Sequence, residues 1–94
     1  MNLGCDIIAV NRFERWTPLW VSRYFGDAVY NQWIERNQSI DYLASRWAMK
    51  ESIFKCCGIR ENIVNDTSGK PISKYCAVSA THDNNMCWAI AVKL

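Results

Sequence analysis

The 94-residue chain has little glycine, proline or histidine (Gly 4, Pro 2, His 1) and no run of apolar residues near the length of a membrane span, which takes about 20 residues. Neither sign of charge dominates, because 11 Lys and Arg face 9 Asp and Glu, a formal net charge of +2. A general surface for nucleic acid or membranes needs a larger or more clustered excess. We therefore expect neither partner, while a local basic site for a phosphorylated small molecule remains open.

The N-terminal segment MNLGCDIIAVNRFER has no basic region and has an early aspartate, so we expect no signal peptide. The five cysteines form no C-x-x-C pair, and the adjacent Cys56 and Cys57 suit neither an easy disulfide nor a zinc knuckle. Free buried thiols are typical of proteins in a reducing compartment. The expected location is therefore the cytoplasm.

The length predicts a single domain, residues 1–94. A domain of this size buries only about 60–65% of its unfolded surface and is marginal alone. The chain is nevertheless rich in aromatic residues, with Trp 5, Tyr 4 and Phe 3. We expect part of this aromatic surface to lie in an interface between subunits.

Helical patterns occupy the first two thirds of the chain. Residues 11–16 are expected to form a helical turn, and residues 19–36 a helix that Gly26 weakens or splits. The longest helix is expected from residue 39 or 40 to residue 57, with Gly58 as the residue that ends it.

Extended patterns lie at both ends. Residues 2–9 read as a short buried strand, 62–66 as an extended piece, 76–80 as a strand, 82–85 as a turn and 86–94 as a final strand. The fold class is therefore α+β, with a long central helix packed on a small, mainly antiparallel sheet. In the first strand Leu3, Cys5 and Ile7 share a face; in the last, bulky Met86, Trp88, Ile90, Val92 and Leu94 alternate with Cys87, Ala89, Ala91 and Lys93.

A glutamate interrupts the apolar stripe of the central helix. Leu43, Trp47, Glu51 and Lys55 follow one another at i, i+4 spacing. Since Leu43 and Trp47 should face the core, Glu51 lies at the border of the buried face. A desolvated carboxylate is costly unless it is paired or bound to metal. An ion pair between Glu51 and Lys55 is one explanation.

Asp6 is the second misplaced carboxylate, since aspartate is unfavourable in a buried strand. It either caps a nearby turn or joins Glu51 in holding one Mg²⁺, an ion that takes carboxylates together with phosphates and water. Lys55, Lys50 and Arg46 would then neutralise the phosphates of a substrate. The alternative is that Arg46 and Lys50, which lie on a neighbouring stripe of the helix, are simply solvated.

His82 is the only histidine, at the end of a strand or in the following turn. It is either structural and exposed, or it contacts a phosphate or carries a proton. Ser68–Pro71, SGKP, lacks the full pattern of a phosphate-binding P-loop, so we do not assign one.

The order of these features resembles that of the holo-[acyl-carrier-protein] synthases, the small-type 4′-phosphopantetheinyl transferases. GCDII at 4–8 resembles the family's first strand, and LASRWAMKESIFKCCG at 43–58 resembles its signature helix. SGKP at 68–71 and VSATHDNNMCWAIAV at 78–92 resemble its later segments. One departure is that Gly58 is followed by Ile-Arg-Glu, where the family has a Gly-Thr-Gly loop.

The resemblance implies transfer of 4′-phosphopantetheine from coenzyme A to a serine of apo-acyl carrier protein, with Mg²⁺ as cofactor, adenosine 3′,5′-bisphosphate as the other product and a role in fatty acid biosynthesis. It also implies a homotrimer with its sites at subunit interfaces. By the match, Asp6 and Glu51 are the metal ligands, Glu51 and Lys55 are catalytic, and the coenzyme A site is lined by Arg46, Lys50, Lys55 and His82.

Two points stay open at this level. The proton of the attacking serine can go to Glu51 or to a metal-bound water. The chain can also be a degenerate, non-catalytic relative that binds coenzyme A or is purely structural, or an unrelated α+β interaction module.

Overall fold

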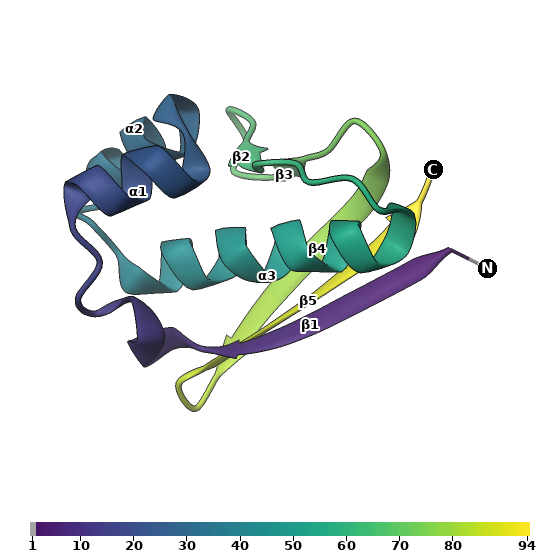
Figure 1. The fold of residues 1–94 in the computed structure, drawn as a ribbon, viewed down its shortest axis with the longest axis horizontal. Helices are drawn as coiled ribbons and strands as arrows, with labels where there is room; N and C mark the ends of the chain where they lie inside the picture. The colour runs from purple at the N-terminus through teal and green to yellow at the C-terminus, as the bar shows by residue number, and fades with distance from the viewer. Residues whose placement is uncertain (1) are drawn as a thin grey trace.

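A computed structural model of the chain describes residues 2–94. It has a long helix across an antiparallel sheet, with shorter elements above the helix (Figure 1). The predicted α+β fold is thus confirmed. In chain order the elements are β1 (Leu3–Ala9), the 3₁₀ helix η1 (Val10–Phe13), α1 (Pro18–Phe25), α2 (Asp27–Glu35), α3 (Ile40–Cys57), β2 (Val64–Asn65), β3 (Pro71–Ile72), β4 (Cys76–Asp83) and β5 (Met86–Lys93).

Both ends of α3 follow from local chemistry, and the prediction for this helix is confirmed. The Ser39 side chain accepts a hydrogen bond from the Tyr42 amide at 3.2 Å, which satisfies a free N–H group of the first turn. Gly58 ends the helix in the left-handed conformation, with φ of 73°.

The helical pattern at residues 19–36 is two helices in the structure. Gly26 has φ of 83° and separates α1 from α2, so the split allowed by the sequence is observed. Thr17 caps α1 by accepting from the Trp20 amide at 3.3 Å, and Pro18 occupies its first turn.

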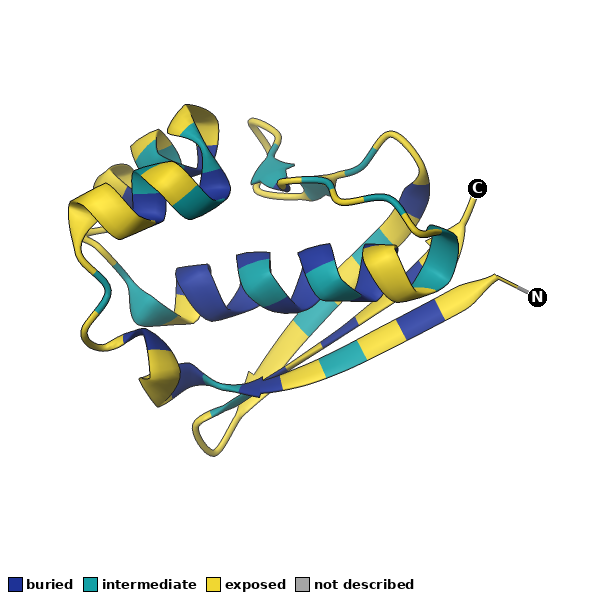
Figure 2. Cartoon of the chain, in the orientation of Figure 1, coloured by how far each residue is buried: buried dark blue, intermediate teal, exposed yellow. Residues whose placement is uncertain are grey.

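α3 is covered on two opposite sides. The sheet lies on one side, and α1, α2 and the β2–β3 hairpin lie on the other (Figure 1). The helix is therefore buried along most of its length and around most of its circumference (Figure 2). Arg46 is 5% exposed and Lys50 8% exposed, so the alternative that they are simply solvated is wrong. The one-sided stripe of a surface helix does not apply to a helix between two layers.

The contact between α3 and the sheet depends on small residues. A Cβ atom built on Gly4 would overlap the Ser52 carbonyl oxygen and lie 2.7 Å from the Cys56 amide nitrogen. The Ser52 hydroxyl donates to the Ala89 carbonyl oxygen of β5 at 3.2 Å. Glycine in β1 therefore lets the helix and the strand approach backbone to backbone.

The sheet order is β1-β5-β4, and both pairings are antiparallel. The small face of β5 packs on α3 and the bulky face points away, with Trp88 55% exposed. In β1, Leu3, Cys5 and Ile7 share one face as predicted, but this face is exposed, so the strand is not buried on both sides. Alternation predicts which residues share a face, but not which face meets the helix.

β4 and β5 are joined by a tight turn. Asn84 and Asn85 have φ of 48° and 63°, the left-handed pair that a two-residue hairpin turn requires. β4 therefore continues to Asp83, beyond the predicted strand at 76–80, and His82 lies within the strand. No helix within residues 2–94 combines the length and the apolar character needed to span a membrane.

Candidate active site

Asp6 and Lys55 meet where the last turn of α3 crosses β1. The Lys55 ammonium donates to Asp6 Oδ1 at 2.8 Å and to the Cys5 carbonyl oxygen at 3.1 Å. The Asp6 side chain is only 16% exposed, so this partner offsets the cost of its burial. The hydrogen bond to Asp6 raises the pKa of Lys55, and the charge of Glu51 adds to the rise. Lys55 therefore faces the negative potential of both carboxylates.

Glu51 has a different partner from the expected one. Its Oε1 lies 3.5 Å from Arg60 Nη1, whose guanidinium also lies over the Phe54 ring at 4.1 Å. The expected Glu51–Lys55 ion pair is not the one formed, because Lys55 turns to Asp6 instead. An i, i+4 pair on a helix contributes only about 0.3–0.5 kcal/mol, which is easily outweighed by a tertiary partner.

Lys50 lies beneath α1. Its ammonium is 4.2 Å from the centre of the Tyr24 ring and donates to the Tyr24 carbonyl oxygen at 3.3 Å. Trp47 stacks on the same ring, with 5.0 Å between centroids. Burial lowers the pKa of Lys50, and the nearby Arg60 lowers it further. Lys50 is thus held by aromatic residues, close enough to Glu51 for their charges to interact.

Arg46 and His82 line one cavity of about 280 Å³ between α3, the β2–β3 hairpin and β4. Arg46 Nη1 donates to Asn65 Oδ1 at 2.7 Å and to the Ile63 carbonyl oxygen at 3.3 Å, while burial lowers its pKa. His82 Nε2 donates to the Asp41 carbonyl oxygen at 3.0 Å. Lys70 also lines the cavity, and none of the lining residues is acidic. The cavity therefore suits a phosphate group.

The turn that carries Lys70 is fixed by one carboxylate. Asp66 Oδ1 accepts from the Ser68 amide at 2.9 Å, the Ser68 hydroxyl at 2.6 Å and the Lys70 amide at 3.0 Å. These bonds lower the pKa of Asp66, so it stays ionised and the turn stays formed.

Residue-by-residue reasoning missed Asn65, Lys70 and Arg60 as candidate site residues. The Ser-Gly-Lys-Pro turn was a usable signal for Lys70. Asn65 and Arg60 had no such signal, because only the fold brings them against Arg46 and Glu51.

The residues expected to bind a cofactor separate into distinct places. Lys55 lies with Asp6 at the end of α3, Lys50 lies under α1, and Arg46 and His82 share the basic cavity. Arg46 and Lys55 are about 14 Å apart along the helix axis at 1.5 Å per residue. An elongated ligand with phosphates at two positions can reach both places.

Comparison with known proteins gives the family of this chain. The family model described as the 4′-phosphopantetheinyl transferase superfamily matches residues 2–86.

The chain belongs to this superfamily.

Membership assigns it to a class of enzymes. The holo-[acyl-carrier-protein] synthase of Herpetosiphon aurantiacus is 28% identical over 100 residues, which cover 88% of this chain and 78% of that protein. The synthase of Edwardsiella ictaluri is 33% identical over 84 residues, 76% of this chain and 67% of that protein.

Solved structures of the superfamily share the fold. The holo-[acyl-carrier-protein] synthase of Neisseria meningitidis superposes with a TM-score of 0.79 at 21% identity, covering 99% of this chain and 97% of that one. The synthase of Bacillus anthracis, solved in complex with CoA (3′,5′-ADP), has a TM-score of 0.76 at 25% identity, covering 98% and 94%.

The two carboxylates of this site, Asp6 and Glu51, suit a metal ion that needs few protein ligands. Within residues 2–94 no group of three or more His, Cys, Asp or Glu side chains is placed to enclose a metal ion. Asp6 and Glu51 instead offer hard oxygen ligands. The negative charges of both carboxylates already act on one cation, the Lys55 ammonium. This donor set fits Mg²⁺, which takes one or two protein carboxylates and completes its shell with phosphate and water.

Proposed function

We propose that this chain transfers 4′-phosphopantetheine from coenzyme A to a serine hydroxyl of an apo-acyl carrier protein in the cytoplasm, with Mg²⁺ as cofactor and adenosine 3′,5′-bisphosphate as the other product. The observation that carries the proposal is the position of Lys55, which faces the Asp6 and Glu51 carboxylates where α3 crosses β1. The relatives named holo-[acyl-carrier-protein] synthase support the same reaction.

Each side chain has a role that follows from its surroundings. Asp6 and Glu51 would hold Mg²⁺, which when bound supplies charge neutralisation at the pyrophosphate. Lys55 is 52% exposed and can leave Asp6 to stabilise the negative charge on the departing bisphosphate. The serine oxygen attacks the β-phosphorus, and its proton passes to Glu51 or to water beside it. Lys50, fixed under α1, supports the position of Glu51 through its charge.

The basic cavity of Arg46, Lys70 and His82 would bind the phosphate on the adenosine half of coenzyme A. The buried Arg46 is already oriented by Asn65, and a guanidinium has further N–H donors to offer. Binding energy gained here, away from the reacting phosphorus, holds the pyrophosphate against Lys55.

The direct test combines the protein with coenzyme A, Mg²⁺ and several apo-carrier proteins, and measures the mass of each carrier. The proposal expects a gain equal to one 4′-phosphopantetheine group. If no carrier gains mass although the protein binds coenzyme A by calorimetry, the chain is a non-catalytic relative. If it neither transfers nor binds coenzyme A, an unrelated role is supported.

Lys70→Ala is expected to raise the KM for coenzyme A about tenfold with little change in kcat, because a hydrogen bond from a charged group contributes about 1.5–3 kcal/mol. The matched control is Lys74→Ala, an exposed lysine outside the cavity. Equal KM values for the two variants would remove the cavity from the coenzyme A site.

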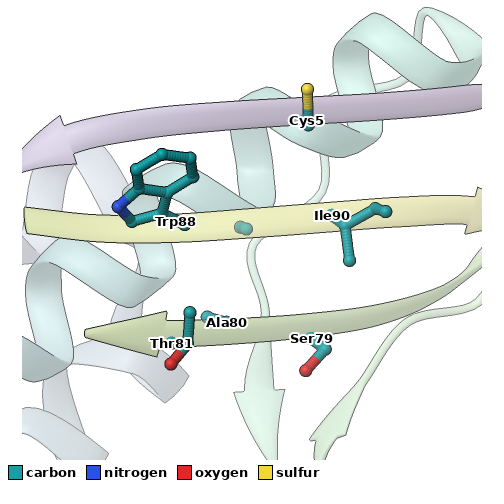
Figure 3. A pocket seen from close by; sticks show the side chains of 7 residues that line it. Cys5, Ser79, Ala80, Thr81, Trp88 and Ile90 are labelled. Carbon is teal, nitrogen blue, oxygen red and sulfur yellow. The ribbon is translucent and has the colours of Figure 1, made fainter. Parts of the chain in front are cut away.

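The outer face of the sheet is the proposed trimer interface. Cys5, Ile90 and Ser79 lie in one row across the strands, and Ile7, Trp88 and Thr81 lie in the next. All of these residues except Ile7 line a hollow of about 250 Å³, and Figure 3 shows their side chains on the face of the sheet that points away from the helices. The rows carry no charged residue, and a chain this short gains stability by burying such a face against copies of itself.

Trp88→Lys is expected to convert a trimer to monomers, because a charge in the middle of the interface would be desolvated. Light scattering coupled to size-exclusion chromatography measures the mass. Trp20→Lys is the control, since Trp20 is 63% exposed on α1 and outside the sheet. A monomeric wild-type protein, or a trimeric Trp88→Lys variant, would contradict the interface.

A carrier protein with an acidic surface is proposed to dock beside α1. A hollow of about 360 Å³ there is lined by Arg12, Arg15, Trp16 and Trp20, and Arg12 also lies 5.7 Å from the centre of the Trp47 ring. Exposed arginine and tryptophan side chains suit an acidic protein surface.

A further inference from the structure

Three thiols gather at the end of α3 that faces the start of β4. Cys56 and Cys57 are the last residues of the helix, and Cys76 is the first residue of β4. The Cys76 thiol donates to Cys56 Sγ, with 3.9 Å between the two sulfur atoms. Cys57 also lies close enough to Cys76 to raise the pKa of that thiol. All are free thiols, and the site proposed above uses none of them.

The two sulfur atoms lie close enough for a bond. A disulfide needs about 2.05 Å between the sulfurs, so side-chain rotation and a small backbone shift have to bring them about 1.9 Å closer. Both positions lie at the ends of their elements rather than in the middle. Cys56 is followed within α3 by a single residue before Gly58 ends the helix, and such terminal turns are the parts of a fold that adjust most easily.

The cysteines of the pair are chemically different. Cys76 is buried, and this burial, with the hydrogen bond to Cys56, raises its pKa to about 12. Cys76 therefore keeps its proton at neutral pH. Cys56 is only partly buried, so it is the member of the pair that an oxidant can reach.

We propose that Cys56 is an oxidation site for hydroperoxides and that Cys76 resolves the product to a Cys56–Cys76 disulfide. In the first step the Cys56 sulfur attacks the terminal peroxide oxygen; an S–O bond forms, the O–O bond breaks, and the leaving oxygen takes up the proton released by the Cys56 thiol, giving water from hydrogen peroxide or an alcohol from an organic hydroperoxide. In the second step the Cys76 sulfur attacks the Cys56 sulfur; the S–S bond forms, the S–O bond breaks, and the hydroxyl leaves as water with the Cys76 proton. Two thiols are oxidised and one peroxide is reduced.

The disulfide would close a loop around the segment between α3 and β4, which carries several residues of the proposed site. Cys56 and Cys76 are 20 positions apart, and the residues between them include Arg60, Asn65 and Lys70. These side chains contact Glu51 or line the basic cavity. Oxidation would therefore tie both ends of this segment together directly after Lys55. The disulfide itself does not depend on the proposed transferase function.

The experiment uses the full chain with Cys5→Ser, which removes the exposed thiol that would link separate molecules. Hydrogen peroxide is titrated in, free thiols are alkylated after denaturation, and the intact mass is measured. We expect two fewer alkylated cysteines, reversal by dithiothreitol, and a tryptic peptide 56–60 linked to peptide 75–93.

Variants decide which sulfurs react. Cys57→Ala should keep the linked peptide, while Cys56→Ala and Cys76→Ser should lose it. Cys76→Ser should also accumulate a sulfenic acid at Cys56 that dimedone labels, provided circular dichroism shows a folded protein; Cys76→Ala serves if the serine variant is unfolded. Loss of the link in Cys57→Ala, or oxidation of Cys56 to sulfinic acid with no linked peptide in the parent protein, would overturn the proposal.

Discussion

Glu51→Gln is expected to lower the rate of 4′-phosphopantetheine transfer at least about 100-fold, the order of effect seen when a preorganised charged group is removed from an active site. The amide keeps the shape of the side chain but loses the negative charge that the proposed Mg²⁺ and the serine proton both need. Carrier mass measured against time gives the rate. Asp6→Asn is expected to act in the same direction, because it removes the main interaction that raises the pKa of Lys55.

Glu35→Gln is the matched control, since Glu35 is an exposed glutamate at the end of α2. The Glu51→Gln protein should keep its thermal unfolding temperature within a few degrees, because the ion pair with Arg60 at 3.5 Å is largely at the surface and such pairs contribute about 0–1 kcal/mol. Undiminished transfer by Glu51→Gln would rule out the metal and proton roles and leave the carboxylate a structural partner of Arg60.

Gly4→Ala is expected to lower the free energy of unfolding by at least about 3 kcal/mol, because the added methyl group meets backbone atoms that cannot rotate away. The Ser52 carbonyl oxygen and the Cys56 amide nitrogen belong to the middle and the last turn of α3. Either β1 or α3 has to move, and both carry the proposed metal ligands. Urea unfolding followed by tryptophan fluorescence measures the change.

Gly58→Ala is the control that separates this steric clash from the cost of placing a residue with a Cβ in a left-handed backbone conformation. Gly58 has φ of 73° and nothing within 4 Å of an added Cβ, so the change should cost only about 1–2 kcal/mol, the cost of a left-handed conformation for a residue with a Cβ. If Gly4→Ala costs no more than Gly58→Ala, the close approach of β1 and α3 does not control stability.

Periodicity and capping residues predicted much of the fold. Ser39 and Gly58 gave the bounds of α3, and the alternation of residues 86–94 gave a strand with one bulky and one small face. The same reasoning left open whether Arg46 and Lys50 are solvated. They are buried, because a helix covered on two sides buries positions that a surface helix exposes. This reasoning also predicted β1 as a buried strand, whereas the face with Leu3, Cys5 and Ile7 is exposed, since alternation does not tell whether a face is covered.

For the candidate site, burial costs drew attention to Asp6 and Glu51. Charge and position made Lys55, Lys50, Arg46 and the single histidine, His82, candidates for phosphate contact, and the family's motifs then implied the same residues. The sequence did not predict which of these charged side chains form ion pairs with one another. Lys55 bonds Asp6 rather than Glu51, and Glu51 meets Arg60. Side chains far apart in the chain compete for the same partner, and the winner depends on distances that only packing sets.

The amino-acid sequence by itself determined the fold class, the long helix and the set of charged residues that carry the chemistry, because hydrophobic period, end caps and misplaced carboxylates are properties of neighbouring residues. Only the tertiary structure decided how those charges divide: Asp6, Lys55 and Glu51 at the end of α3, and Arg46, Lys70 and His82 around a cavity near its start. The physical reason is the backbone contact at Gly4, which seats β1 against the last turns of α3 and thereby brings Asp6 to Lys55.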